Sequence, residues 1–108
     1  MGALHDRDDL PWVEASPGIS RRVLAGERLM LVEIRIDADR TVAAHAHPHE
    51  QIGYVLEGRV RFRTGGSEKI LGPGGTYSVP GGEEHSAEAL GAAARLVEVF
   101  TPPREDFR

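Results

Sequence analysis

The sequence is divided into short runs in which apolar and polar residues alternate, and glycine or proline turns separate these runs. The chain of 108 residues contains 13 glycines and 7 prolines. In the run Leu29–Ile36, every second residue from Met30 on is apolar, and Glu33 and Arg35 stand between apolar neighbours. Successive side chains of a strand point to opposite faces, so this pattern predicts a strand with one buried face.

The same alternation predicts strands along most of the chain, and no segment shows a sustained helical period. Residues 87–94 have a helix-friendly composition, but Gly91 interrupts them, and we expect a strand end and a loop there. About eight short strands between turns are typical of an all-β sandwich or barrel. The expected strands are Leu29–Ile36, Val42–His47, Ile52–Leu56, Arg59–Arg63, Ile70–Leu71, Thr76–Val79, His85–Leu90 and Arg95–Phe100.

The length fits one domain. The polar segment 1–18 carries Pro11 and Pro17 and is predicted to be an arm or edge segment, and residues 19–108 are predicted to be the folded domain. A net charge of −4 gives no general attraction to nucleic acid. No apolar run approaches the ~20 residues of a membrane span. The N-terminus lacks the basic-then-apolar pattern of a signal peptide, so we expect a cytoplasmic protein.

Histidine and glutamine side chains form a candidate metal site. His45 and His47 stand two residues apart in an expected strand, so their side chains share a face. Gln51 follows the bend at Pro48, and His85 lies far along the chain. The chain has no cysteine, and three imidazoles with one amide oxygen suit a divalent ion such as Zn, Ni, Fe, Mn or Co. An uncharged amide ligand leaves the ion's full charge to polarise a substrate oxygen.

Other interpretations of this segment are open at this point. His49 and Glu50 are rival ligands, and the whole stretch His45–Glu50 could be a solvated polar turn.

The sequence resembles the cupins at two motifs. The first cupin motif, G(X)5HXH(X)3–4E(X)6G, is matched from His45 to Gly58, and Gln51 replaces its glutamate. The second motif, G(X)5PXG(X)2H(X)3N, is matched from Gly74 to His85. The resemblance implies a cupin fold, which is a double-stranded β-helix or jelly-roll barrel. Two motif positions differ, because Asp39 replaces the first opening glycine and Ala89 replaces the closing asparagine.

The motif spacing favours one ligand set. Six residues separate Gln51 from Gly58, as in the cupins, and a ligand at Glu50 would break that count. His49 and Glu50 are therefore predicted to lie in a polar turn at the barrel mouth. The predicted metal ligands are His45, His47, Gln51 and His85.

A second resemblance covers residues 23–107. The segments HAHPHEQ, YVLEG, VPGGEEH and VFTPPREDF are similar to those of the small cupins of pectin and alginate breakdown, the KdgF type. That resemblance implies a metal at the four ligands above and a catalytic pair at Glu98 and Arg104, with Glu98 replacing the family's aspartate. The residues alone place Glu98 and Phe100 on one strand face, and they also allow an exposed ion pair between Glu98 and Arg104 on an edge strand.

The resemblance implies an enzyme that opens the ring of 4,5-unsaturated monouronates to the linear 5-keto form. Glu98 would move a proton between the anomeric hydroxyl and C4, and Arg104 would bind the substrate carboxylate. Phe100, Tyr54 and Phe62 are candidates for pocket walls or for core packing. Alternative functions are a metal-dependent dioxygenase or lyase, and a non-catalytic cupin that binds a sugar or effector. Exposed strand edges need cover, so we expect a homodimer.

Overall fold

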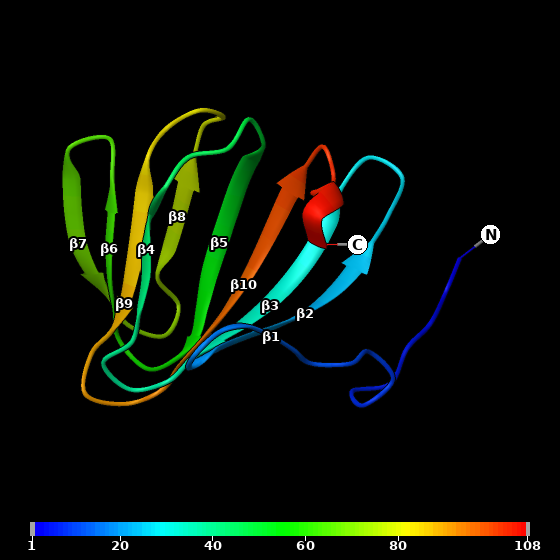
Figure 1. The fold of residues 1–108 in the computed structure, drawn as a ribbon, viewed down its shortest axis with the longest axis horizontal. Helices are drawn as coiled ribbons and strands as arrows, with labels where there is room; N and C mark the ends of the chain where they lie inside the picture. Colours follow the sequence, from blue (N-terminus) through cyan, green and yellow to red (C-terminus); the bar gives the residue numbers. More distant parts are fainter. Residues whose placement is uncertain (1, 108) are drawn as a thin grey trace.

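Ten β-strands and one short 3-10 helix make up the computed structural model, which describes residues 2–107 (Figure 1). Met1 and Arg108, the outer ends of the predicted arm and domain, lie outside the described residues. The strands are β1 (Val13–Ser16), β2 (Ile19–Ala25), β3 (Met30–Ile36), β4 (Thr41–His45), β5 (Glu50–Glu57), β6 (Val60–Thr64), β7 (Ser67–Leu71), β8 (Thr76–Val79), β9 (His85–Ala89) and β10 (Ala94–Thr101), and the helix η1 is Glu105–Phe107.

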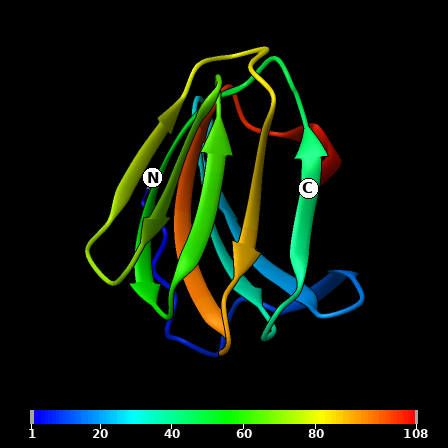
Figure 2. The same ribbon diagram turned by 90° about the vertical axis from the view of Figure 1, so that its left-hand side faces the viewer.

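The strands form two antiparallel sheets, which confirms the predicted all-β fold. One sheet has the order β1-β2-β3-β10-β5-β8, and the other has the order β4-β9-β6-β7. Figure 2 shows the two sheets facing each other around a common interior. No helix within residues 2–107 is long and apolar enough to cross a membrane.

Alternate side chains of each sheet fill the space between the sheets. On β10, Leu96, Glu98 and Phe100 point inward. The apolar interior has a larger cluster around Val55 and Leu96 and a smaller one of Met30, Val32 and Phe100, against which Phe107 packs. Among the described residues, the buried polar or charged side chains are Gln51, His85 and Glu98. Buried polar groups need partners, so these three residues indicate that this part of the barrel interior is a candidate functional site and not only apolar core.

Two details differ from the predictions, and part of the segment predicted as an arm or edge is a strand. Strand β4 ends at His45 instead of His47, because the chain leaves the sheet before Pro48, which has no N–H for a ladder. Tyr54 faces outward and is 48% exposed, so it neither lines the cavity inside the barrel nor belongs to the core. Part of the predicted arm, Val13–Ser16, forms the edge strand β1 and pairs with β2.

Asp39 shows why the first cupin motif opens with glycine. Its φ angle of 62° lies in the left-handed region that favours glycine. An aspartate side chain can offset part of this cost with a local hydrogen bond. Here the Asp39 carboxylate accepts a hydrogen bond of 2.9 Å from the Gly91 N–H.

The homodimer stays a prediction, and the outer face of the six-stranded sheet suggests where to test it. Ile52 is 55% exposed there beside Tyr54, and β1 and β8 are the sheet's edges. We expect light scattering after size exclusion to give twice the mass of one chain, and Ile52→Asp to weaken association. A wild-type mass of one chain at micromolar concentration would contradict the expectation.

Candidate active site

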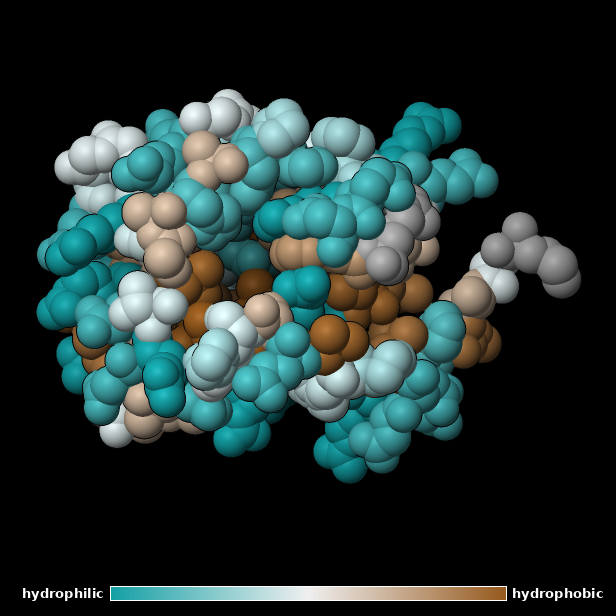
Figure 3. Space-filling model, viewed as in Figure 1, coloured by the Kyte–Doolittle hydropathy of each residue, from teal (hydrophilic) through white to brown (hydrophobic). Residues whose placement is uncertain are grey.

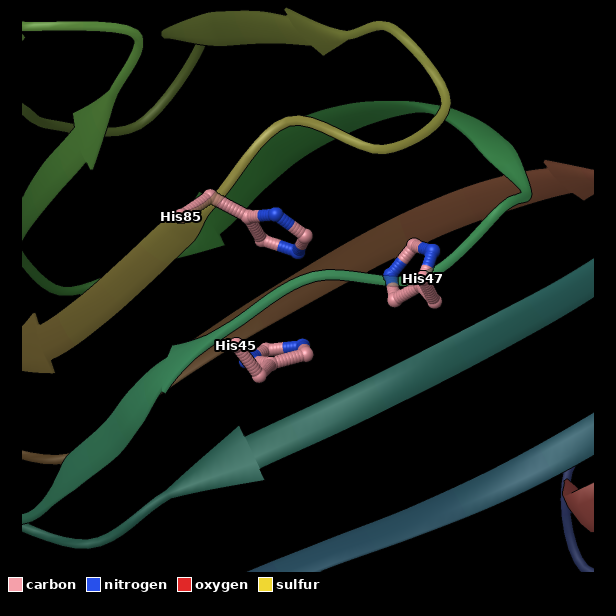
Figure 4. A group of neighbouring side chains, drawn as sticks. All are labelled: His45, His47 and His85. Atoms are coloured by element: carbon pink, nitrogen blue, oxygen red, sulfur yellow. The ribbon is translucent and has the colours of Figure 1, made fainter.

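Three histidines from separate places in the sequence meet inside the barrel. His45 ends β4, His47 lies in the loop that follows, and His85 begins β9. Their side chains project into the same space in Figure 4. One ligand nitrogen from each lies within 4.8 Å of the others, so the three side chains form a possible metal site.

Two structural features bring the histidines together. His45 and His85 are paired across β4 and β9, so their rings are neighbours on one sheet face. His47 is outside the strand, and its loop is held by the turn before β9, where Gly82 N–H donates to the His47 carbonyl over 2.8 Å. The same turn requires Gly81, because a Cβ there would lie 2.3 Å from the Pro48 carbonyl oxygen. The glycines of the second motif therefore position a histidine of the first.

The hydrogen bonds of the imidazoles leave one nitrogen of each ring available. Each Nδ1 lies against a backbone carbonyl: His45 against Ala43 at 2.7 Å, His47 against His49 at 3.2 Å, and His85 against Glu83 at 2.9 Å. A carbonyl can only accept, so each Nδ1 carries the hydrogen and each neutral ring keeps a lone pair on Nε2. Metal-ligating histidines have this arrangement.

The protein environment also favours the neutral form of two of these rings. Burial lowers the pKa of His47 to about 4, and the charges of Arg104, His85 and His45 add to the effect. Burial likewise lowers the pKa of His85. Neutral imidazoles are metal ligands, and the Nε2 of His47 is buried without a hydrogen-bond partner among the described residues.

Gln51 adds an oxygen donor to the same region. It is 2% exposed, and its Nε2 donates to Glu98 Oε2 over 2.8 Å. Its Oε1 is buried and has no hydrogen-bond partner within residues 2–107. A buried carbonyl oxygen without a partner is costly, and a metal ion would satisfy it. The donor set of three imidazoles and an amide oxygen therefore fits a divalent ion.

The rival ligands lie elsewhere. Glu50 is exposed, because Gln51 takes the inward position of β5. The His49 ring lies 5.4 Å from the His47 ring, centre to centre, but its nitrogens are not part of the three-histidine group.

Glu98 is a buried carboxylate beside Gln51. Its strand β10 lies between β3 and β5, and the side chain is 6% exposed, so the alternative of an exposed residue on an edge strand is wrong. Tyr77 donates a hydrogen bond of 2.6 Å to Glu98 Oε2, the oxygen that Gln51 also contacts. Both donors therefore converge on Oε2, and neither of these two hydrogen bonds reaches Oε1.

The contact between Tyr77 and Glu98 depends on a glycine. The sheet register places Glu98, Gly53 and Tyr77 side by side on β10, β5 and β8. Because Gly53 has no side chain, the Tyr77 ring lies across β5 and reaches Glu98. A Cβ at Gly53 would lie 2.0 Å from Tyr77 Cζ. Sequence reasoning missed both residues, because only the register brings them beside Glu98.

Burial gives Glu98 an acid–base character suited to neutral pH. It raises the pKa of this carboxyl to about 7, although the Tyr77 hydrogen bond, the Arg104 charge and the Gln51 hydrogen bond oppose the rise. A group with a pKa near the working pH can both accept and donate a proton efficiently.

Arg104 lies close enough to this region to lower the pKa of His47, but it already has an anionic partner. Its Nε and Nη2 donate to the two carboxylate oxygens of Asp106, at 3.3 and 2.8 Å. The guanidinium carbon lies 5.3 Å from the centre of the Phe100 ring. The alternative of an ion pair between Arg104 and Glu98 is therefore wrong, and Arg104 pairs with Asp106 instead.

A small cavity adjoins these residues. Its polar lining residues are His45, Gln51, His85 and Glu98. Phe62 and Phe100, two of the three aromatic residues considered for pocket walls or core packing, also line it. Its volume is about 70 Å³. Figure 3 shows one face of the molecule, with a hollow that contains apolar residues and has hydrophilic residues around it.

Comparison with known proteins agrees with this description. Residues 32–100 match the cupin domain family. The chain is 31% identical over 102 residues to the pectin degradation protein KdgF of Dickeya dadantii, and the match covers 93% of each chain. The structure of KdgF from Halomonas sp. has a TM-score of 0.94 and 29% identity, with both chains fully covered. An RmlC-like cupin from Shewanella frigidimarina has a TM-score of 0.93 and 29% identity, covering 100% of this chain and 97% of that one.

A methyl group at Gly53 should separate Tyr77 from Glu98. We expect Gly53→Ala to lower the free energy of unfolding by about 1–3 kcal/mol, the usual cost of forcing an atom into a packed interior. Urea denaturation measures this change. Gly72→Ala is the matched control, because a Cβ there would meet nothing within 4 Å. Equal stability of both variants would show that Tyr77 does not need the space above Gly53.

Proposed function

The chain belongs to the cupin family and is a relative of the pectin degradation protein KdgF, and we propose that it is a metal-dependent enzyme that opens the ring of 4,5-unsaturated monouronates. Such sugars are the products of pectin and alginate lyases. The reaction is an isomerisation to the linear 5-keto-4-deoxyuronate, so it needs no oxidant, reductant or second substrate.

One observation carries the proposal: a buried carboxylate that accepts a hydrogen bond from Gln51 stands beside a possible metal site. Ring opening requires a proton to leave one substrate atom and another to arrive at a second atom. Glu98 can do both at neutral pH. An uncharged amide in the ligand set also suits an ion that polarises a substrate oxygen instead of one that cycles between redox states.

The proposed ligands are the Nε2 atoms of His45, His47 and His85 and the Oε1 atom of Gln51. When bound, a divalent ion would supply positive charge that stabilises developing negative charge on a substrate oxygen. The ion's identity among Zn, Ni, Fe, Mn and Co is not assigned by this donor set.

Glu98 performs the proton transfers in this proposal. Its Oε1 takes the proton from the anomeric hydroxyl, C1=O forms, and the bond between C1 and the ring oxygen breaks. The electron pair of that bond stays on the ring oxygen, which becomes the enolate oxygen at C5. Glu98 then returns the proton to C4, and C5 becomes a ketone. Tyr77 and Gln51 keep Oε2 occupied, so that Oε1 faces the substrate.

Arg104 recognises the substrate carboxylate in this proposal. Its guanidinium already holds two carboxylate oxygens in a fork, those of Asp106, which is the geometry that a uronate carboxylate would take. Phe100 lies under the guanidinium and also lines the cavity, so it is placed between the clamp and Glu98.

We expect one divalent ion per chain in the purified protein. His45→Ala, His47→Ala or His85→Ala should empty the site. Gln51→Ala should weaken metal binding by at most about 100-fold, the upper end of the usual effect of changing one residue around a bound metal. Elemental analysis after dialysis measures occupancy. His49→Ala is the matched control and should retain the ion. If His49→Ala empties the site while Gln51→Ala does not, the ligand set is wrong.

The metal-loaded protein should speed the loss of the conjugated C4=C5 chromophore of unsaturated galacturonate, followed by ultraviolet absorbance. Glu98→Gln keeps the shape of the side chain but cannot transfer a proton, so kcat should fall roughly 10²–10⁴-fold. Glu98→Asp, the residue of the resembled family, should retain part of the activity.

The outcomes separate the alternative functions. If Glu98→Gln turns over the substrate as fast as wild type does, the proposed reaction is correct and a different residue is the acid–base group. If the wild-type protein does not speed the loss of the chromophore above the rate in buffer, with unsaturated galacturonate or with its epimer, the proposal is contradicted. Such a result would favour a binding cupin or a different metal-dependent reaction.

A further inference from the structure

A second arginine lies beside Arg104 at the C-terminal helix η1. The guanidinium carbons of Arg21 and Arg104 each lie 3.9 Å from the centre of the Phe107 ring. The two carbons are therefore no farther apart than twice that distance. A carboxylate that accepted hydrogen bonds from both guanidinium groups would have to take the place of the Phe107 ring.

Arg21 projects toward the interior of the barrel. It stands on β2 directly opposite Ile34 of β3, and Ile34 lines the cavity beside Glu98. Within residues 2–107, the Arg21 side chain has no hydrogen bond or ion pair, and its guanidinium lies over the face of Phe107. Burial lowers the pKa of Arg21, and the charge of Arg104 adds to this effect, whereas the charge of Asp106 opposes it.

The carboxylate of Asp106 forms a fork with Arg104. Asp106 is 58% exposed, whereas the Arg104 side chain it contacts is 14% exposed. The carboxylate thus comes from the solvent side to a guanidinium that lies inside. Asp106 hydrogen-bonds Arg104 and not Arg21, so this one carboxylate does not offset the charge of both guanidinium groups.

We propose that Arg21 and Arg104 together form the clamp for the substrate carboxylate, and that Asp106 occupies this clamp until a uronate replaces it. The inference rests on the proposed function, and it adds Arg21 as a residue that determines specificity for acidic sugars. Exchange of one carboxylate for another keeps the hydrogen bonds of Arg104. Phe107 must shift with Asp106, because η1 carries both. A cavity of about 70 Å³ is far below the roughly 300 Å³ of small-molecule pockets, so such a shift would also make room.

The test compares galacturonate with galactose, which differ at the carboxylate, by calorimetric titration of the metal-loaded protein. Wild type should bind galacturonate and not galactose. Arg21→Gln should weaken galacturonate binding roughly 10- to 100-fold, the usual value of hydrogen bonds to a charged group. Arg21→Lys should weaken it less. Arg35→Gln, at an exposed arginine of β3, is the control and should bind as wild type does.

Asp106→Asn gives the sharper result. It removes the resident carboxylate, so galacturonate should bind several-fold more tightly and KM for unsaturated galacturonate should fall. A residue that only supported Arg104 would give weaker binding. Circular dichroism of each variant checks that the barrel is intact.

The outcomes distinguish this inference from the proposed function. If unsaturated uronates are not turned over but galacturonate binding needs Arg21, the clamp stands and the reaction fails. If turnover is present and Arg21→Gln leaves KM and galacturonate binding unchanged, the clamp is wrong and the reaction stands. Weaker binding by Asp106→Asn, or no carboxylate-dependent binding or turnover by wild type, also overturns the clamp.

Discussion

The hydrogen bond from Gln51 Nε2 to Glu98 Oε2 connects the two halves of the candidate site. It sets the orientation of the Gln51 amide, because a carboxylate accepts and the NH₂ group must donate. The opposite end of the amide, Oε1, is then left for the three-histidine group. The same bond and the Tyr77 hydroxyl occupy one Glu98 oxygen. The proposed metal ligation and the proposed proton transfer are therefore joined by one side chain, in an interior where buried polar groups need partners.

Glycines provide the space that this arrangement needs. Gly53 leaves the gap through which the Tyr77 ring reaches Glu98, and Gly81 lets the turn before β9 approach the Pro48 carbonyl in the histidine loop. Neither contact would tolerate a Cβ atom at these distances. The barrel thus supplies two things: a register that aligns side chains across neighbouring strands, and positions where a missing side chain lets one element lie against another.

Much of the fold and part of the site could be predicted from the sequence. Period-2 alternation identified most strands. Motif spacing selected Gln51 over Glu50 as the inward residue, and the structure agrees because inward and outward positions alternate along β5 from Gln51 on. Tyr77 could not be found this way, since its position beside Glu98 depends on pairing between β5 and β8. The outward direction of Tyr54 follows from the same alternation that buries Gln51, which a search for aromatic pocket walls overlooked. Arg21 and Arg104 are 83 residues apart, and only the closed barrel brings them to the ring of Phe107.

Anomalous diffraction from crystals of the cobalt- or zinc-loaded protein tests the central claim most directly. The account predicts one anomalous peak per chain, at about 2.0–2.2 Å from the Nε2 atoms of His45, His47 and His85 and from Gln51 Oε1. Gln51 Nε2 should still donate to Glu98 in that structure. A peak ligated by His49 or by the Glu98 carboxylate, or a Gln51 amide turned away from the ion, would contradict the division between metal ligation and proton transfer.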